Sequence, residues 1–279
     1  MVRPNPRAAP GAPDVATTDD WRENFLLAAI PAAEHRRLLA HCESIELPFG
    51  AQLYEQGERI QYVYFPTGGF VSLIASIDRR SRVEVGLVGK EGMLGVWLLA
   101  GVDAAPVRAL VQGAGPALRI EAEAFSRALK RSPVLRRVLM RYLYVLMSQL
   151  AQMAACASFH VVEARLARWL LMTRDRAHSN EFSLTQEFLA YMLGVRRAGV
   201  TRAARSLQRS KIIRYSRGKM IVLDGRGLAR ASCECYAAGR QIYWQLLRVG
   251  GRGPSAGDRR NNRGRNGRST RESLRAATR

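Results

Sequence analysis

Arginine side chains are concentrated in one short stretch of this sequence. Between Arg196 and Gln208, small and apolar residues recur at helical spacing, and the arginines fall on the remaining positions. A guanidinium group donates a rigid fork of hydrogen bonds, which suits phosphate oxygens and the O6 and N7 atoms of guanine. The spacing predicts a helix with a small buried face and a cationic exposed face, suited to the DNA major groove.

The flanking residues predict how this helix is positioned. Thr185 is a good N-cap for a preceding helix whose apolar stripe runs over residues 188–193, and Gly194 can adopt the left-handed backbone of a tight turn. Val195 can fill the gap between the two helices. Downstream, residues 212–215 and 220–223 predict two strands around a basic glycine turn. Together these elements are typical of a winged helix-turn-helix; the alternative is an ordinary amphipathic helix pair with solvated arginines.

Charge is distributed unevenly along the chain. The formal net charge is +21, and residues 160–249 hold 17 Lys and Arg against 6 Asp and Glu, whereas residues 1–159 are nearly balanced at 18 against 15. A regional basic excess is expected of a domain that binds a phosphate backbone. The Arg- and Gly-rich residues 250–279 predict a disordered tail, either a solvated extension or a nonspecific nucleic-acid tether.

Several function classes find no support in the sequence. We expect no transmembrane span, a disordered Pro- and Ala-rich leader over residues 1–20, and a cytoplasmic location. Hydrolase-elbow and phosphate-loop motifs are absent, so we expect no catalytic residues and no enzyme. No metal-ligand spacing relates the four histidines, which are His35, His41, His160 and His178.

The cysteines show no Cys-x-x-Cys spacing. They are Cys42, Cys156, Cys233 and Cys235. We expect ordinary reduced thiols and no metal site, with a redox or metal role as the alternative. An iron–sulfur cluster is not expected, because the thiols belong to three separate segments of the sequence.

The region upstream of the basic helix predicts a small β domain. Short runs rich in β-branched and aromatic residues, separated by glycines, indicate an antiparallel sandwich or jelly-roll barrel. These runs are Ile45–Leu47, Gln52–Tyr54, Tyr62–Phe65, Gly69–Ile74 and Arg82–Val88.

Helices are expected after the barrel. Residues 121–130 predict a short helix, and Pro133 begins a longer one in which apolar residues alternate at spacings of four and three. This spacing predicts a dimer seam of Leu135, Leu139, Tyr142, Leu146, Gln149 and Met153. The alternative is that this helix packs only on its own barrel.

The order of barrel, long helix and winged helix-turn-helix resembles the Crp/Fnr family of bacterial transcription regulators. The resemblance covers about residues 21–236; its motifs are Gly57-Glu58, Val63-Tyr64-Phe65-Pro66 with Gly69, Gly86 to Gly95, and Leu184-Thr185-Gln186-Glu187 through Gly194, Val200 and Arg202. It implies an α+β fold with a cyclic-nucleotide-binding-like barrel at 21–132, a dimerisation helix at 133–160 and a DNA-binding domain at 161–236.

The resemblance implies a role for each basic residue. Arg197 and Arg202 match arginines that the family uses for guanine contact, and Ala198 replaces a glutamate found in many members, so a different operator is expected. A homodimer would read a palindromic promoter site and contact RNA polymerase. Base contact is expected from Arg197, Thr201 and Arg202, and backbone contact from Thr185, Gln186, Arg196, Arg217 and Lys219.

The barrel departs from the nucleotide-binding members of that family. Gly95 is followed by Val96, and Val107 stands where a phosphate-binding arginine is expected, with Arg108 one place along. Cyclic nucleotide binding is therefore not expected, and no cofactor is assigned. The candidate effector pocket comprises Lys90, Glu91, Gly95 and Arg108. The alternative function is a sensor or interaction module with vestigial or nonspecific nucleic-acid binding, including RNA.

Overall fold

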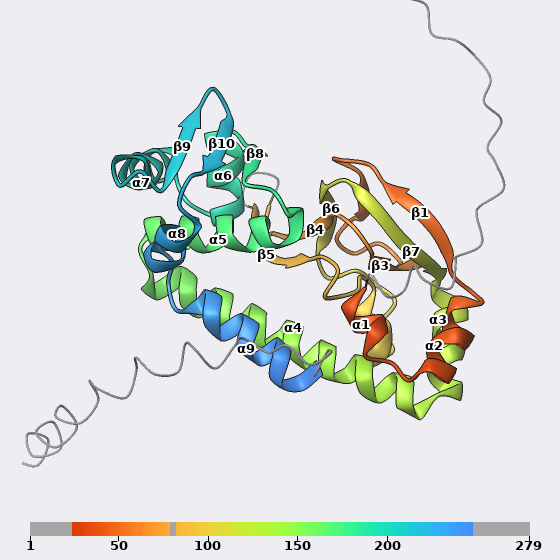
Figure 1. The fold of residues 1–279 in the computed structure, drawn as a ribbon. Coiled ribbons are helices and arrows are strands. Elements are labelled where there is room, and N and C mark those ends of the chain that lie inside the picture. The colour runs from red at the N-terminus through yellow and green to blue at the C-terminus, as the bar shows by residue number, and fades with distance from the viewer. Residues whose placement is uncertain (1–23, 79–81, 248–279) are drawn as a thin grey trace, which may run out of the picture. The chain divides into compact units, whose positions relative to one another are not determined.

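The computed structural model describes residues 24–78 and 82–247 (Figure 1). The leader expected at 1–20 and the tail expected at 250–279 lie outside the described residues. Two antiparallel sheets form the N-terminal part, with strand orders β1-β7-β3 and β2-β6-β4-β5. The strands are β1 (Glu43–Leu47), β2 (Gln52–Tyr54), β3 (Tyr62–Pro66), β4 (Phe70–Ser76), β5 (Arg82–Val88), β6 (Arg108–Gly113) and β7 (Gly115–Glu121).

The antiparallel β architecture predicted from the glycine-separated runs is confirmed. All five predicted runs are strands, and β6 and β7 complete the two sheets. Phe65 on β3 is wholly buried against Phe125, with ring centroids 6.4 Å apart. Phe125 lies on α3 (Ala122–Arg131), the short helix predicted after the barrel.

Two further helices precede the barrel, α1 (Phe25–Ala28) and α2 (Ala32–Leu39), and were not predicted. Buried Asn24 fixes the first of them. Its side-chain oxygen accepts from the Leu27 amide at 3.0 Å, and its amide nitrogen donates to the carbonyl oxygens of Pro66 and Gly92, both at 2.9 Å. Because both the oxygen and the nitrogen of this amide have hydrogen-bond partners, its burial leaves no polar group unsatisfied. A 3₁₀ turn, η2 (Val96–Ala100), follows β5.

The long helix α4 (Pro133–Phe159) begins where the sequence predicted. Ser132 caps it by accepting from the Leu135 amide at 3.1 Å, and Pro133 occupies the first turn, where a missing N–H costs nothing. The α5 helix (Val162–Ala177) follows after a two-residue junction. Within the described part of the chain, no helix is both long and apolar enough to cross a membrane.

The predicted dimer seam packs largely within its own chain. Leu135, Leu139, Tyr142 and Leu146 are all buried, and the Tyr142 hydroxyl donates to the Met93 carbonyl oxygen at 3.4 Å. Gly92 leaves room for that ring, since a β-carbon there would collide with it. These four residues are therefore not free to contact a second chain, and the alternative, packing on the barrel, describes them.

A different stripe of α4 is exposed. Tyr144 is 62% exposed and Met147 is 56% exposed, and they continue the spacing that starts at Met140. Ala151 and Ala154, also exposed, extend it. The exposed stripe therefore comprises Met140, Tyr144, Met147, Ala151 and Ala154, at alternating spacings of four and three.

The C-terminal part builds the helix-turn-helix around its own core. Its elements are α5, β8 (Glu181–Ser183), α6 (Gln186–Leu193), α7 (Arg197–Arg209), β9 (Ile213–Ser216), β10 (Lys219–Val222) and α8 (Gly225–Ala231). The core packs Leu166, Leu170, Leu189, Val200 and Leu207, all fully buried. The strand β8 pairs with β10 and makes the wing a three-stranded sheet of order β8-β10-β9, a strand that the sequence did not predict.

The last described helix, α9 (Cys235–Leu247), lies along α4 (Figure 1). It was not predicted. At its start, Cys235 lies close to Cys156, His160 and Cys233. Spacing along the chain gave no sign of this convergence, because Cys156 and Cys233 are 77 residues apart.

Candidate nucleic-acid interface

The turn between α6 and α7 has the predicted chemistry. The Thr185 side-chain oxygen accepts from the Phe188 amide at 3.0 Å, as an N-cap does. Gly194 ends α6 with φ at 61°, and Val195 packs partly buried against the domain core. A left-handed residue here lets α7 start after only three intervening residues.

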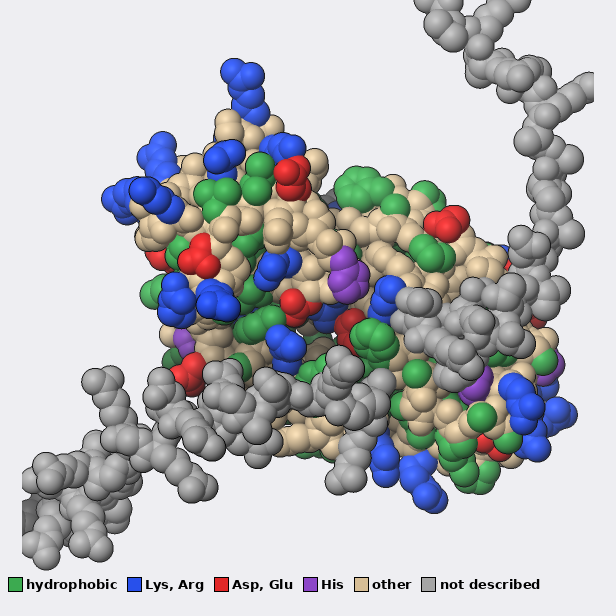
Figure 2. Space-filling model, viewed as in Figure 1, with side chains coloured by type: hydrophobic (Ala, Val, Ile, Leu, Met, Phe, Trp, Pro, Cys, Tyr) green, Lys and Arg blue, Asp and Glu red, His purple; other side chains and the backbone are tan. Residues whose placement is uncertain are grey.

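The second helix presents opposite faces to the core and to solvent. Val200, Ala203, Ala204 and Leu207 are buried, as predicted from their spacing. The exposed positions of α7 and its N-cap carry Arg196, Arg197, Ala198, Arg202, Arg205 and Arg209. In Figure 2, Lys and Arg side chains gather over α7 and over the hairpin beside it.

Thr201 is less free than the predicted arginines. Its hydroxyl lies 2.8 Å from the Gln186 side-chain oxygen on α6 and 3.1 Å from the Arg197 carbonyl oxygen. Since a hydroxyl has one proton, these two acceptors share it, and the oxygen lone pairs remain available. The structure thus brings a predicted base-reading residue and a predicted phosphate-binding residue together across the two helices.

The wing is the predicted two-stranded hairpin with a third strand beside it. Arg217 and Gly218 form its turn with φ at 49° and 77°, which is the backbone of a type I′ hairpin. Arg217 is exposed at the tip. Lys219 is also exposed but pairs with Glu181 at 2.6 Å, so part of its charge is already offset.

Hydrogen bonds attach the wing to the helices. The Tyr215 hydroxyl donates to the Leu184 carbonyl oxygen at 2.8 Å, and the Gln208 side chain donates to the Tyr215 carbonyl oxygen at 3.2 Å. Both bonds hold β9 against the helix-turn-helix. The tip and α7 are therefore presented as one unit.

A buried carboxyl connects this domain to the barrel, a contact that no local sequence pattern predicts. Glu84 on β5 accepts from the Trp169 indole nitrogen on α5 at 2.9 Å and from the Ser72 hydroxyl at 2.7 Å. Burial raises the pKa of Glu84 to about 7, although both hydrogen bonds and the charges of Arg176 and Arg168 act in the opposite direction. The protonation of Glu84 is thus coupled to the contact between α5 and the barrel.

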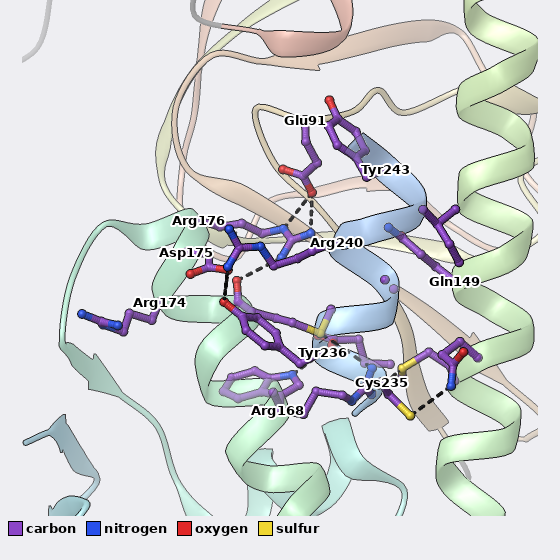
Figure 3. Close-up of a pocket in the computed structure, with 18 of the residues that line it drawn as sticks. Glu91, Gln149, Arg168, Arg174, Asp175, Arg176, Cys235, Tyr236, Arg240 and Tyr243 are labelled. Carbon is purple, nitrogen blue, oxygen red and sulfur yellow. Dashed lines mark hydrogen bonds and ion pairs between the residues drawn. The ribbon is translucent and has the colours of Figure 1, made fainter. Parts of the chain in front are cut away.

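An ion pair makes a second connection. The Arg176 Nε donates to Glu91 at 2.9 Å, and its Nη1 donates to the Met172 carbonyl oxygen at 3.0 Å (Figure 3). Glu91 was predicted as an effector-pocket residue. Here it holds α5 against the loop after β5.

Beside these contacts lies a cavity of about 620 Å³ (Figure 3). Its walls come from β5, α4, α5 and α9, and Arg168, Arg176, Arg240, Tyr236 and Tyr243 contribute to its lining. This volume lies in the usual range for small-molecule sites.

The predicted effector residues are not brought together in it. Of the four, only Glu91 lines this cavity. Gly95 lines a separate pocket of about 10 Å³ inside the barrel, which has room for about one water molecule and not for a nucleotide. Arg108 faces Glu55 at 3.8 Å, and the Lys90 carbonyl oxygen accepts from the Phe25 amide.

Comparisons with known proteins agree with this geometry. A family model described as a Crp-like helix-turn-helix domain matches residues 164–231. A search of curated proteins gives no significant match.

Solved structures share the fold at low sequence identity. A putative Crp/Fnr-family transcriptional regulator from Eubacterium rectale has a TM-score of 0.62 at 17% identity, covering 75% of this chain and 98% of that one. The c-di-GMP-responsive global regulator CLP from Xanthomonas campestris has a TM-score of 0.58 at 18% identity, covering 69% and 99%. FixK2 from Bradyrhizobium japonicum has a TM-score of 0.58 at 15% identity, covering 69% and 98%. Residues 164–231 thus form a Crp-like helix-turn-helix domain, and the chain shares the fold of solved Crp/Fnr-family transcriptional regulators.

Proposed function

We propose that the protein acts in the cytoplasm as a homodimer that binds a palindromic promoter site through α7 of each chain. The observation that carries this proposal is the exposed face of α7, where Arg197 and Arg202 reach solvent while the opposite face is buried. Both guanidinium groups can approach base edges in the major groove as forks. Ala198 offers no acceptor beside them, so its base pair is not read by a hydrogen bond.

Backbone contact is assigned to the periphery of the same surface. Arg196 stands at the entrance of α7, and Arg217 stands at the wing tip, each exposed. Thr185 and Gln186 begin α6, whose N-terminal amides suit a phosphate. Lys219 can contact a phosphate only if its ion pair with Glu181 breaks. These contacts fix orientation and make affinity depend on salt.

The exposed stripe of α4 supports the homodimer. Large apolar side chains at Met140, Tyr144 and Met147 cost free energy while they face water, and a second copy of the stripe would cover them. The 4-3 spacing is that of a coiled-coil seam. A two-fold axis through this stripe would relate two α7 helices, as a palindromic site requires.

We assign the signal-dependent step to the region where the barrel meets α5. Trp169 and Arg176 connect α5 to Glu84 and Glu91, and the 620 Å³ cavity adjoins both pairs. A molecule that binds better when these contacts are broken would shift the domain toward a second arrangement. Once on DNA, the regulator would act on transcription through RNA polymerase.

The proposed function is tested with DNA selected by the protein from a random duplex pool. The selected sequences should contain two inverted half-sites about one helical turn apart, roughly 10 base pairs. Arg197→Ala plus Arg202→Ala should weaken binding about a hundredfold or more, since each lost bidentate contact costs about 1–3 kcal/mol.

Controls separate sequence reading from charge alone. Arg36→Ala plus Arg37→Ala removes the same charge from α2 and should leave affinity nearly unchanged. Deletion of residues 250–279 should lower nonspecific affinity but keep the sequence preference. Undiminished binding by the Arg197/Arg202 variant would refute α7 as the reader, and a preference for RNA would favour the alternative function.

A further inference from the structure

Three cysteines and one histidine converge where α4, α8 and α9 meet. They are Cys156, His160, Cys233 and Cys235, and their side-chain ligand atoms all lie within 4.8 Å of one another. Cys156 and His160 occupy the last turn and the C-cap of α4. Cys233 lies between α8 and α9, and Cys235 is the first residue of α9.

Two of the distances within the cluster match those around a single tetrahedral ion. The Sγ atoms of Cys156 and Cys233 are 3.6 Å apart, and the Cys235 Sγ lies 3.6 Å from the His160 Nδ1. Metal–sulfur and metal–nitrogen bonds of about 2.3 and 2.0–2.1 Å, at tetrahedral angles, separate two sulfurs by roughly 3.8 Å and a sulfur from a nitrogen by roughly 3.6 Å. With all four atoms within 4.8 Å of one another, small side-chain shifts would bring the remaining pairs to these separations.

The surroundings also fit a bound metal. The Gln152 side-chain nitrogen lies 3.0 Å from the Cys235 Sγ, and such a donor to a ligand atom is usual around metal sites. The three cysteines are buried, while His160 is more exposed. Burial of three sulfur ligands limits exchange with solvent.

A buried cation beside the cluster supports the same conclusion. Arg168 is 5% exposed, and its guanidinium is hydrogen-bonded to the thioether sulfurs of Met153 and Met172. Among residues 24–78 and 82–247, no carboxylate lies within ion-pair distance of it. Three thiolates around a divalent ion leave one net negative charge, which would offset that of Arg168.

We propose that Cys156, His160, Cys233 and Cys235 bind one divalent metal ion of the zinc class in a tetrahedral site. Soft thiolates with one imidazole favour zinc over magnesium or calcium. An iron–sulfur cluster is disfavoured, because its own iron and sulfide atoms would hold the four ligands farther apart. A disulfide between Cys156 and Cys233 would use two of the sulfurs and leave Cys235 and His160 without a role.

The position of the site gives the ion a mechanical role. His160 and Val161 are the only residues between α4 and α5, so the site lies at the junction of the dimer helix and the DNA-binding domain. A bound ion would fasten the start of α9 to that junction. The angle between α4 and α5 would then depend on metal occupancy.

Metal content and cobalt spectroscopy on the full-length chain test the proposal. Protein purified under reducing conditions, or reconstituted with Zn²⁺, should hold one zinc ion per chain, and Co²⁺ should give the intense thiolate-to-metal absorption of a tetrahedral site. Cys156→Ser and Cys233→Ser should lose the metal. Cys42→Ser is the matched control, since Cys42 is a buried thiol that donates to the Leu38 carbonyl oxygen, and it should retain the metal.

His160→Ala should weaken zinc binding at least tenfold, with His41→Ala as its control. The proposal is overturned by wild-type protein that takes up neither Zn²⁺ nor Co²⁺, by iron with acid-labile sulfide, or by a Cys156–Cys233 disulfide in place of metal. Equal metal content in Cys156→Ser and Cys42→Ser would overturn it too. If the cysteine variants do not fold, the wild-type cobalt spectrum decides, because weak bands without thiolate absorption contradict the site.

Discussion

Replacing Glu84 by glutamine should change how stability depends on pH. The folded protein holds the pKa of this carboxyl at about 7, against 4.5 for the free side chain. Between these values the folded state binds a proton that the unfolded state has lost, so stability falls as pH rises through that window. At 1.36 kcal/mol per pKa unit, the ionised carboxyl costs about 3 kcal/mol above pH 7.

Glu84→Gln keeps the shape and remains neutral at every pH. Its amide oxygen can accept from the Trp169 indole, and its amide nitrogen can donate to the Ser72 hydroxyl. Urea denaturation, followed at pH 5 and at pH 8, should therefore give unfolding free energies for variant and wild type that differ by no more than about 1 kcal/mol at pH 5. At pH 8 the variant should be more stable by about 3 kcal/mol.

Two controls identify the cause of that difference. Glu84→Ala should destabilise at both pH values, because it leaves the buried indole N–H without an acceptor. Glu46→Gln changes an exposed carboxyl and should follow the wild-type profile. Parallel pH profiles for wild type and Glu84→Gln would refute the argument that burial keeps this carboxyl protonated.

Two further predictions concern the helices around the site. Tyr144→Lys should convert the proposed dimer to a species of the 31.1 kDa chain mass in light scattering, because it places a charge in the exposed stripe. Ile77→Lys, which changes an exposed side chain outside α4, should leave the dimer intact. A dimer that survives Tyr144→Lys would exclude the stripe as its interface. Gly194→Ala should lower the unfolding free energy by about 1–2 kcal/mol, since its φ of 61° strains alanine and its β-carbon would lie 3.0 Å from Val83; an unchanged urea midpoint would contradict this.

Local signals were enough to predict the DNA-binding unit. The cap at Thr185, the stop at Gly194 and the apolar spacing from Val200 each act within a few residues, so the sequence determined both helices and the buried face of α7. The type I′ turn at Arg217-Gly218 is equally local. The three-residue strand β8 was too short to carry a pattern of its own.

Long-range packing decided what the sequence could not. Two stripes of α4 follow the same 4-3 spacing, and long-range contacts such as that of Tyr142 with the Met93 carbonyl show which one the barrel covers. The pairing of Glu84 with Trp169 joins residues 85 positions apart. The cysteine cluster depends on α9 returning along α4, which no residue near Cys235 indicates.

The exposed stripe on α4 gives the proposed dimer a sensitivity to its own abundance. When the subunits separate at low concentration, the population able to occupy both half-sites grows with the square of the free chain concentration. Promoter occupancy would then change more steeply than protein level, as a threshold does. For a regulator of this kind, a modest change in its own synthesis or degradation is enough to move a promoter from largely unbound to largely bound.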